Sequence, residues 1–391
     1  MFPGGVDSRV PGRTANESLS ARSPVIGVAI PGRIIGYDVA RAVAVIGMVI
    51  VNYHNIFLAG RSHYPQWFTG LASFLLGRAA VIFVMLAGVG ITLMSHKAIL
   101  SGDPLLIKRV RHGLLKRSVV LFFMGLVFLN WWRSDILHFY GLFLSSAALL
   151  LFVPGRRLWL LIGGCLAVGG FLFAIYEADP ILVQILLPAN KFSDFFDSML
   201  ISGQYPMLPW FSFLLVGMWL GRPEIISNRQ LIRRIFRISL LVFLLTVVLD
   251  NYVDTILAHF PNVDYDSPVA LLLLSLPFPI SPFFAVSAMA GSLVVIILCI
   301  TLSSHPLLGR PFARLGAVGK MSLTVYIGHI FLGLAVDRFI FPRLDLAGYP
   351  FFSVAFTLLF CLTVFWGANL WFRYFERGPL EWALRRLAQY L

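Results

Sequence analysis

Two polar side chains near the end of the first predicted membrane helix have the types and spacing that acid–base chemistry needs. Asn52 lies in the last turns of that helix, and His63 follows it by eleven residues in a short loop. An imidazole titrates near neutral pH and can take a proton from a hydroxyl or an amine. A carboxamide within hydrocarbon is costly unless it has a partner or a function. The pair therefore indicates chemistry at a membrane surface.

Two other histidines compete for this role. His54 is two residues from Asn52, on nearly the opposite helix face, and ranks second. Asp135 and His138 are spaced i, i+3 at the start of another predicted helix, where a carboxylate can orient a base. The same two residues also fit a helix-start charge and an interfacial histidine. A loop histidine such as His63 is more often solvated than catalytic, so position alone does not decide.

One face of the first helix has a charged inner end and a polar outer end. At 100° per residue, a narrow stripe is expected to contain Asp38, Arg41, Met48, Asn52 and Asn55. Asp38 and Arg41 are one turn apart and can pair. Asn52 lies about 16 Å further along the helix. The stripe fits a helix that lines a passage, or a helix anchored by an ion pair whose Asn52 bonds to a neighbouring helix.

Arg78 is predicted to lie inside the second apolar segment, where a charge usually faces a polar cavity. It can hold an anionic group of a substrate or pair with Asp135. Gly88 and Gly90 follow in the same segment. They favour close helix packing over the alternative, which is room for a narrow acyl or pantetheine chain.

A basic cluster follows this segment on the side expected to be cytoplasmic. The members considered as cofactor ligands are Arg109, Arg111, Lys116 and Arg117. Positive-inside topology and anionic lipid explain such a cluster, and so does a cofactor with several phosphates. No glycine-rich phosphate loop of the usual soluble types is present in the sequence.

The composition identifies an integral membrane protein. Of its 391 residues, 59% are hydrophobic and 13% are charged, far from the balance of a soluble domain. Apolar runs long enough to cross the bilayer predict an all-α, polytopic fold with ten transmembrane helices. They are expected at about 37–58, 71–95, 114–131, 135–153, 157–176, 207–221, 234–252, 281–303, 315–336 and 350–372. An apolar piece at 268–279 would make eleven, although its prolines favour a re-entrant or interfacial segment.

Charge placement orients the chain. The predicted outer loops contain only five of the 31 Lys and Arg residues: Arg61, Arg133, Lys191, Arg338 and Arg343. Positive-inside bias therefore puts both termini in the cytoplasm, and it explains the net charge of +13 without nucleic acid. We expect a disordered cytoplasmic tail at 1–34, one membrane domain at 35–376 and a cytoplasmic segment at 377–391. The three cysteines lie in apolar spans and have no disulfide or metal spacing. The default location is a bacterial inner membrane.

The motifs resemble a known superfamily. The Asp38-x-x-Arg41 motif is similar to the start of the first helix in transmembrane acyltransferases. The acyltransferase-3 branch has a histidine fourteen residues after the Asp, whereas this chain has Asn52. That resembles the heparan-alpha-glucosaminide N-acetyltransferase branch, which has an asparagine there and a catalytic histidine eleven residues later, at the position of His63.

The second half resembles a related bacterial family of multispanning proteins of uncharacterised function. The similarity lies in residues 319–326, in residues 377–382 and in the segment from Phe211 to Arg222.

The resemblance implies an acyl-CoA-dependent enzyme. Acyl-CoA, acetyl-CoA by the resemblance, would bind from the cytoplasm with its phosphates on basic residues. His63 would act as general base, or less readily as a transient acyl carrier, and Asn52 would donate to the oxyanion. Asp38 and Arg41 would hold the inner mouth. The acceptor would be an envelope glycan, a lipid or a small molecule with a hydroxyl or an amine.

Two alternatives remain. In a transporter or flippase for a small polar or lipid-linked molecule, Arg41, Arg78 and Asn52 would line a permeation path. The chain could instead be a membrane partner that positions another enzyme. The sequence does not decide between a monomer and a homodimer.

Overall fold

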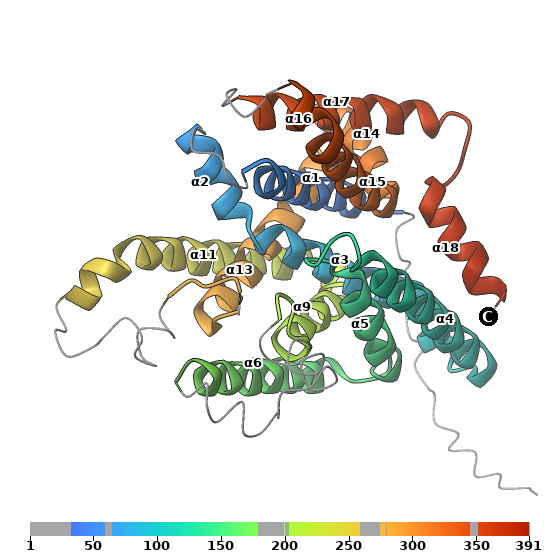
Figure 1. Ribbon diagram of the computed structural model, residues 1–391. Helices are drawn as coiled ribbons and strands as arrows, with labels where there is room; N and C mark the ends of the chain where they lie inside the picture. Colours follow the sequence, from blue (N-terminus) through green and yellow to red (C-terminus); the bar gives the residue numbers. More distant parts are fainter. Residues whose placement is uncertain are drawn as a thin grey trace, which may run out of the picture.

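The computed structural model describes residues 33–58, 65–178, 199, 203–258, 274–278, 280–344 and 351–390. Within these ranges the regular elements are all helices (Figure 1). They are α1 (Ile35–Leu58), α2 (Gln66–Leu75), α3 (Arg78–Ser101), α4 (Pro104–Phe128), α5 (Leu137–Leu149), α6 (Gly155–Ala178), α9 (Met207–Leu220), α10 (Pro223–Ile226), α11 (Arg229–Ala258), α13 (Pro282–Ser303), α14 (Gly309–Lys320), α15 (Ser322–Ala335), a single π-helical turn (Val336–Ile340), α16 (Phe341–Leu344), α17 (Phe352–Trp371) and α18 (Pro379–Tyr390). The predicted all-α class is confirmed for this part of the chain.

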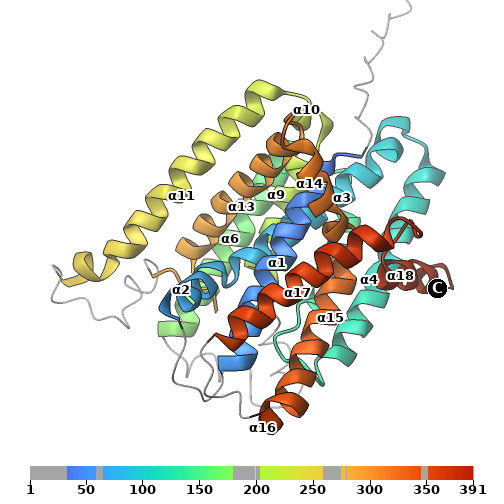
Figure 2. The ribbon, with the colours of Figure 1, turned by 90° about the horizontal axis from the view of Figure 1, so that it is seen from above.

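Helix α1 is the centre of the bundle. It contacts α3, α13, α14, α15 and α17, and Figure 2 shows it running between α13 on one side and α15 and α17 on the other. Its apolar side chains Val39, Ala40, Ala44 and Val45 are fully buried. Small residues let the neighbouring helices approach closely, since packing rather than water exclusion drives helix association in a bilayer. A polar group on the buried faces of α1 is therefore enclosed by protein.

Six helical segments of the described chain are long and apolar enough to cross a membrane. They are Ile35–Phe57, Gln66–Ser101, Gly155–Ile175, Pro282–Ser303, Ser322–Arg343 and Phe352–Trp371. Each overlaps one of the ten predicted spans, although the predicted span 315–336 begins within α14, before the turn at Met321. The count of ten stays a prediction. The other four predictions fall on α4, α5, α9 and α11, which are helical but shorter or more charged.

The segment from Gln66 to Ser101 is broken at Leu76 and Gly77, between α2 and α3. Gly77 has a φ of 72°, which side-chain-bearing residues rarely adopt. A Cβ on Gly77 would lie 2.8 Å from Cζ of Phe284. Irregular backbone at membrane depth is tolerated where it is buried in protein or lines a cavity.

Replacing Gly77 by alanine is expected to destabilise the fold by about 1–3 kcal/mol, because it adds backbone strain to a clash. Thermal unfolding of the purified protein measures this effect. Gly70→Ala in α2 is the matched control, since no atom lies within 4 Å of its added Cβ. Equal melting temperatures for the two variants would contradict the argument.

Helices α3 and α9 pack backbone to backbone. A Cβ on Gly88 would overlap the Leu214 carbonyl, and a Cβ on Gly217 would overlap the Met85 carbonyl. Gly88 thus has the packing role that the sequence favoured. Gly90 instead faces Arg41, whose Nη2 would lie 3.4 Å from an added Cβ.

Helix α18 contacts α4 and α15, and its Glu381 carboxylate caps the start of α15. Oε1 accepts from the backbone N–H groups of Leu323 and Thr324 at 2.7 and 3.3 Å. Oε2 accepts from the Thr324 hydroxyl at 2.7 Å. A carboxylate suits a helix N-terminus, where the first N–H groups have no intrahelical acceptor. The last helix therefore holds α15 in place.

Candidate functional site

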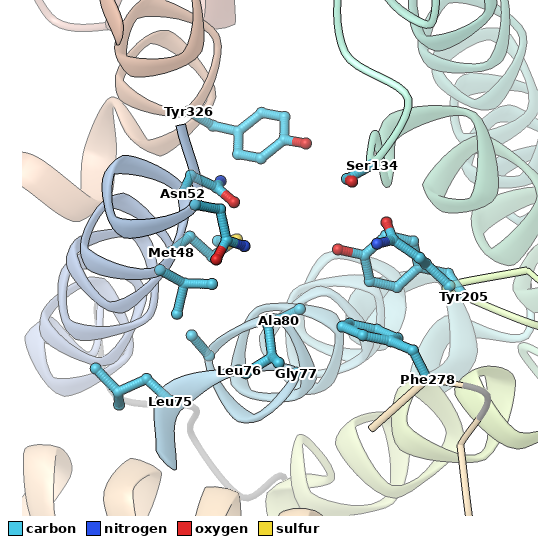
Figure 3. A pocket seen from close by; sticks show the side chains of 14 residues that line it. Met48, Asn52, Leu75, Leu76, Gly77, Ala80, Ser134, Tyr205, Phe278 and Tyr326 are labelled. Carbon is cyan, nitrogen blue, oxygen red and sulfur yellow. The ribbon is translucent and has the colours of Figure 1, made fainter. Parts of the chain in front are cut away.

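A small cavity of about 40 Å³ lies beside the last turns of α1 (Figure 3). Its lining residues are Met48, Val51, Asn52, Asn55, Leu75, Leu76, Gly77, Ala79, Ala80, Ser134, Gln204, Tyr205, Phe278 and Tyr326. In Figure 3, Asn52 and Tyr326 reach it from one side, and Tyr205 and Phe278 from the other. The break at Gly77 and the first turn of α3 form part of the wall. Segments that are distant in sequence thus line the same cavity.

Asn52 lies on the cavity wall and is bonded to a histidine that the sequence analysis missed. Its Nδ2 is 3.0 Å from Nε2 of His329 on α15. His329 has no exposed surface, and its Nδ1 is 3.1 Å from the carbonyl oxygen of Val325. The alternative in which Asn52 bonds to a neighbouring helix is confirmed, and Asn52 also lines the cavity. The predicted passage along α1 stays a prediction.

Tyr326, one turn before His329, forms a second polar pair at the cavity. Its hydroxyl donates to Oδ1 of Asp135 at 3.1 Å. Asp135 is 0% exposed, and its Oδ2 accepts from the backbone N–H of Leu137 at 2.9 Å. These donors give both carboxylate oxygens hydrogen-bond partners within the protein. Sequence reasoning also missed this role of Tyr326, although a polar Tyr326-x-x-His329 pair inside an apolar segment was a usable signal.

The predicted Asp135–His138 pair is present, with Nδ1 of His138 3.3 Å from Oδ2 of Asp135. His138 is nearly buried and is not among the residues that line the cavity. The carboxylate that would orient His138 as a base also binds Tyr326. The geometry therefore favours Tyr326 as the group that connects Asp135 to the cavity.

His54 is a contact between α1 and α2. Its Nε2 is 3.3 Å from the Thr69 hydroxyl, its Nδ1 is 3.4 Å from Oδ1 of Asn55, and its ring packs on Phe68. It is buried and does not line the cavity. His63 lies outside the described residues.

At the other end of α1 the predicted ion pair is confirmed. Nη1 of Arg41 is 3.0 Å from Oδ1 of Asp38. A second cation that was not predicted, Arg33, binds Oδ2 of the same carboxylate at 2.7 Å. Asp38 is buried, whereas Arg41 keeps 28% of its side-chain surface exposed. One carboxylate with two guanidiniums leaves this end of α1 positively charged.

Arg78 faces α13. Its Nη1 donates to the Phe74 carbonyl at 3.0 Å, its Nη2 is 3.5 Å from the Ser287 hydroxyl, and the guanidinium lies 5.0 Å from the Phe284 ring. The alternative in which it pairs with Asp135 is wrong, because the guanidinium is bonded to the Phe74 carbonyl of α2 and to Ser287 of α13 and lies against the Phe284 ring. It is also not among the residues that line the cavity.

The basic cluster on α4 has separate local roles. Nε of Arg111 donates to the Ala148 carbonyl at 3.1 Å, which satisfies an acceptor at the end of α5. Arg117 contacts the Met94 sulfur and lies within electrostatic range of Arg377 and Arg385. Arg109 is exposed and Lys116 is half-buried. No cluster of three or more metal-ligating side chains occurs among the described residues.

Sequence comparison identifies the family to which this arrangement belongs. Residues 33–245, more than half of the chain, match the family described as heparan-alpha-glucosaminide N-acetyltransferase, catalytic. The chain belongs to this family. Residues 220–390 match a second family, described as protein of unknown function (DUF418). No curated protein and no solved structure matches significantly. Both predicted resemblances are confirmed.

The two matched segments share the cavity. Asn52 and Gly77 come from the acetyltransferase-family segment, whereas Tyr326 and His329 come from the second segment. Within this integral membrane protein, the polar wall is complete only when α1 and α15 are packed together.

Proposed function

We propose that the protein is an integral-membrane acyltransferase. It moves an acyl group, acetyl by its family, from cytoplasmic acyl-CoA to a hydroxyl or amine at the outer face. The observation that carries the proposal is the position of Asn52. The family resemblance singles out this residue, and it lies on the wall of a polar cavity within an apolar bundle. A partly buried carboxamide on the wall of a cavity inside a membrane bundle is typical of a reaction or binding site.

The reaction is a nucleophilic substitution at the thioester carbonyl. The acceptor oxygen or nitrogen attacks the carbonyl carbon and loses a proton to His63, the proposed general base. The C–S bond then breaks, and the protonated imidazole returns the proton to the CoA sulfur. The products are the acylated acceptor and free CoA. Negative charge develops on the carbonyl oxygen, and the N-terminus of α3 on the cavity wall favours such charge.

The donor is proposed to enter from the end of α1 that carries Asp38 and Arg41. This end has a net positive charge, and the basic residues of α4 lie on the same side by the predicted topology. The phosphates of CoA can bind the cationic side chains of Arg109, Lys116 and Arg117, of which Arg109 is exposed. The guanidinium of Arg111 is bonded to the end of α5 instead. The termini are then cytoplasmic, and the bilayer is a bacterial inner membrane.

Acetyl-CoA is expected to bind the purified protein with a Kd in the micromolar to millimolar range, as is usual for a co-substrate. Equilibrium binding of radiolabelled acetyl-CoA to protein in lipid nanodiscs measures it, with free CoA as competitor. The variant in which Arg109, Lys116 and Arg117 are all glutamine is expected to weaken binding, because their charges attract the phosphates. Arg233→Gln on α11 is the control.

Absence of binding at millimolar acetyl-CoA would overturn the proposal. Transport of a solute into proteoliposomes without CoA would support the transporter instead.

A further inference from the structure

The side-chain amide of Asn52 can present either a hydrogen-bond donor or a hydrogen-bond acceptor to the cavity. Its nitrogen donates hydrogen bonds, and its oxygen accepts them. With the nitrogen toward the cavity, Asn52 would stabilise a developing oxyanion. With the oxygen toward the cavity, it would hold an O–H or N–H group. The surroundings of His329 decide between the two.

The Val325 carbonyl fixes the tautomer of His329. A carbonyl oxygen only accepts, so the contact of 3.1 Å with Nδ1 requires a proton on Nδ1. In the neutral imidazole, Nε2 then has a lone pair and accepts. The group 3.0 Å from Nε2 must donate, and in Asn52 only the NH2 group can do so. The amide oxygen is therefore directed away from His329.

Aromatic rings enclose His329 on several sides. The rings of Tyr53, Tyr326 and Phe360 lie 5.8, 5.6 and 6.4 Å from the imidazole centroid. The histidine has no exposed surface, so its hydrogen bonds are stronger and costlier to break than in water. A rotated Asn52 amide would place its oxygen against the Nε2 lone pair. The surroundings thus hold one orientation.

We propose that His329 is a positioning residue that orients the Asn52 amide, so that the cavity offers a hydrogen-bond acceptor to the nucleophilic O–H or N–H of the acyl acceptor. The Tyr326 hydroxyl on the same wall donates to Asp135 and accepts from the Ile136 N–H at 3.5 Å, so the acceptor is the Asn52 oxygen. Asn52 then orients the nucleophile instead of donating to the oxyanion. The role of Asn52 toward the nucleophile rests on the proposed acyl transfer. The orientation of the Asn52 amide does not depend on that proposal.

The orientation is tested by ¹⁵N magnetic resonance of histidine-labelled protein in lipid nanodiscs. The signals of His329, one of eight histidines, are assigned by their loss in His329→Gln. We expect a protonated Nδ1 and an unprotonated Nε2 in the wild type. In Asn52→Leu, the Nε2 resonance should move toward that of a free imine nitrogen, while Nδ1 stays unchanged. A protonated Nε2 in the wild type would overturn the proposal, whether or not any acyl transfer is detected.

The consequence for substrate is tested with acetyl-CoA as donor and hydroxylamine as acceptor, which gives acetohydroxamate and CoA. His329→Leu lacks an acceptor for the Asn52 amide and should raise the KM for hydroxylamine about tenfold, the effect of one hydrogen bond. The KM for acetyl-CoA should stay unchanged. His329→Gln supplies an acceptor oxygen and should restore most of the loss. Equal effects on both KM values, or no rescue by glutamine, would contradict the positioning role.

Discussion

Replacing His63 by alanine is expected to lower the rate of acyl transfer by about 10²–10⁴-fold, the usual contribution of a general base. The acceptor nucleophile would then have to lose its proton to water. Binding of acetyl-CoA should not change, because the proposed donor entry lies at the Asp38–Arg41 end of α1. Release of the CoA thiol in the presence of an acceptor measures the rate, and equilibrium binding measures the donor.

His305→Ala is the matched control, since His305 is exposed and follows the far end of α13. It should keep the wild-type rate. His54→Ala is less useful as a control, because His54 links α1 to α2 and its loss affects folding. If His63→Ala retained full transfer activity while folded, His63 would not be the base.

Replacing Asp135 by alanine is expected to destabilise the protein by about 3–5 kcal/mol, the range for breaking a buried charged network. The carboxylate is 0% exposed, and its loss leaves the Tyr326 hydroxyl and the Leu137 N–H without their acceptor. The substitution should also free the Tyr326 side chain at the cavity. Thermal unfolding gives the stability, and activity at low temperature gives the effect on the site.

Tyr326→Phe separates the two effects. It removes the hydroxyl but leaves the carboxylate with its bonds to Leu137 and His138, so its cost should be near 1 kcal/mol. A loss of stability as large as that of Asp135→Ala would show that Tyr326, and not the carboxylate, is the critical member.

Helices and their approximate ends could be predicted from the sequence because long apolar runs have one stable form in a bilayer. All ten predicted spans fall on helices. The break at Gly77 was not predicted, since α2 and α3 are both apolar and the apolar run predicted at 71–95 continues across the junction. The start of α15 at Ser322 was missed for a different reason. Its capping group is Glu381, 58 positions after Leu323, and a local pattern does not reveal such a partner.

The polar face of α1 could be predicted because it depends on one helix alone. Asp38 with Arg41 is a local pair, and Asn52 on the cavity follows from the same stripe. The partner of Asn52 is 277 positions away, on a helix whose neighbours the sequence does not specify. The contacts of Arg78 could not be predicted for the same reason, because its direction toward α13 depends on how two distant helices pack.

The cap on α15 has a consequence for biosynthesis. Membrane helices enter the bilayer in order of synthesis, yet the first N–H groups of α15 receive their acceptor only when Glu381 has been made. Until then α15, which contributes Tyr326 and His329, lacks the contact that fixes its start. A nascent chain that stalls before α18 would therefore contain every residue that lines the cavity, but the start of its α15 would not yet be capped. The final packing of α15, and with it this wall of the cavity, thus depends on the synthesis of α18.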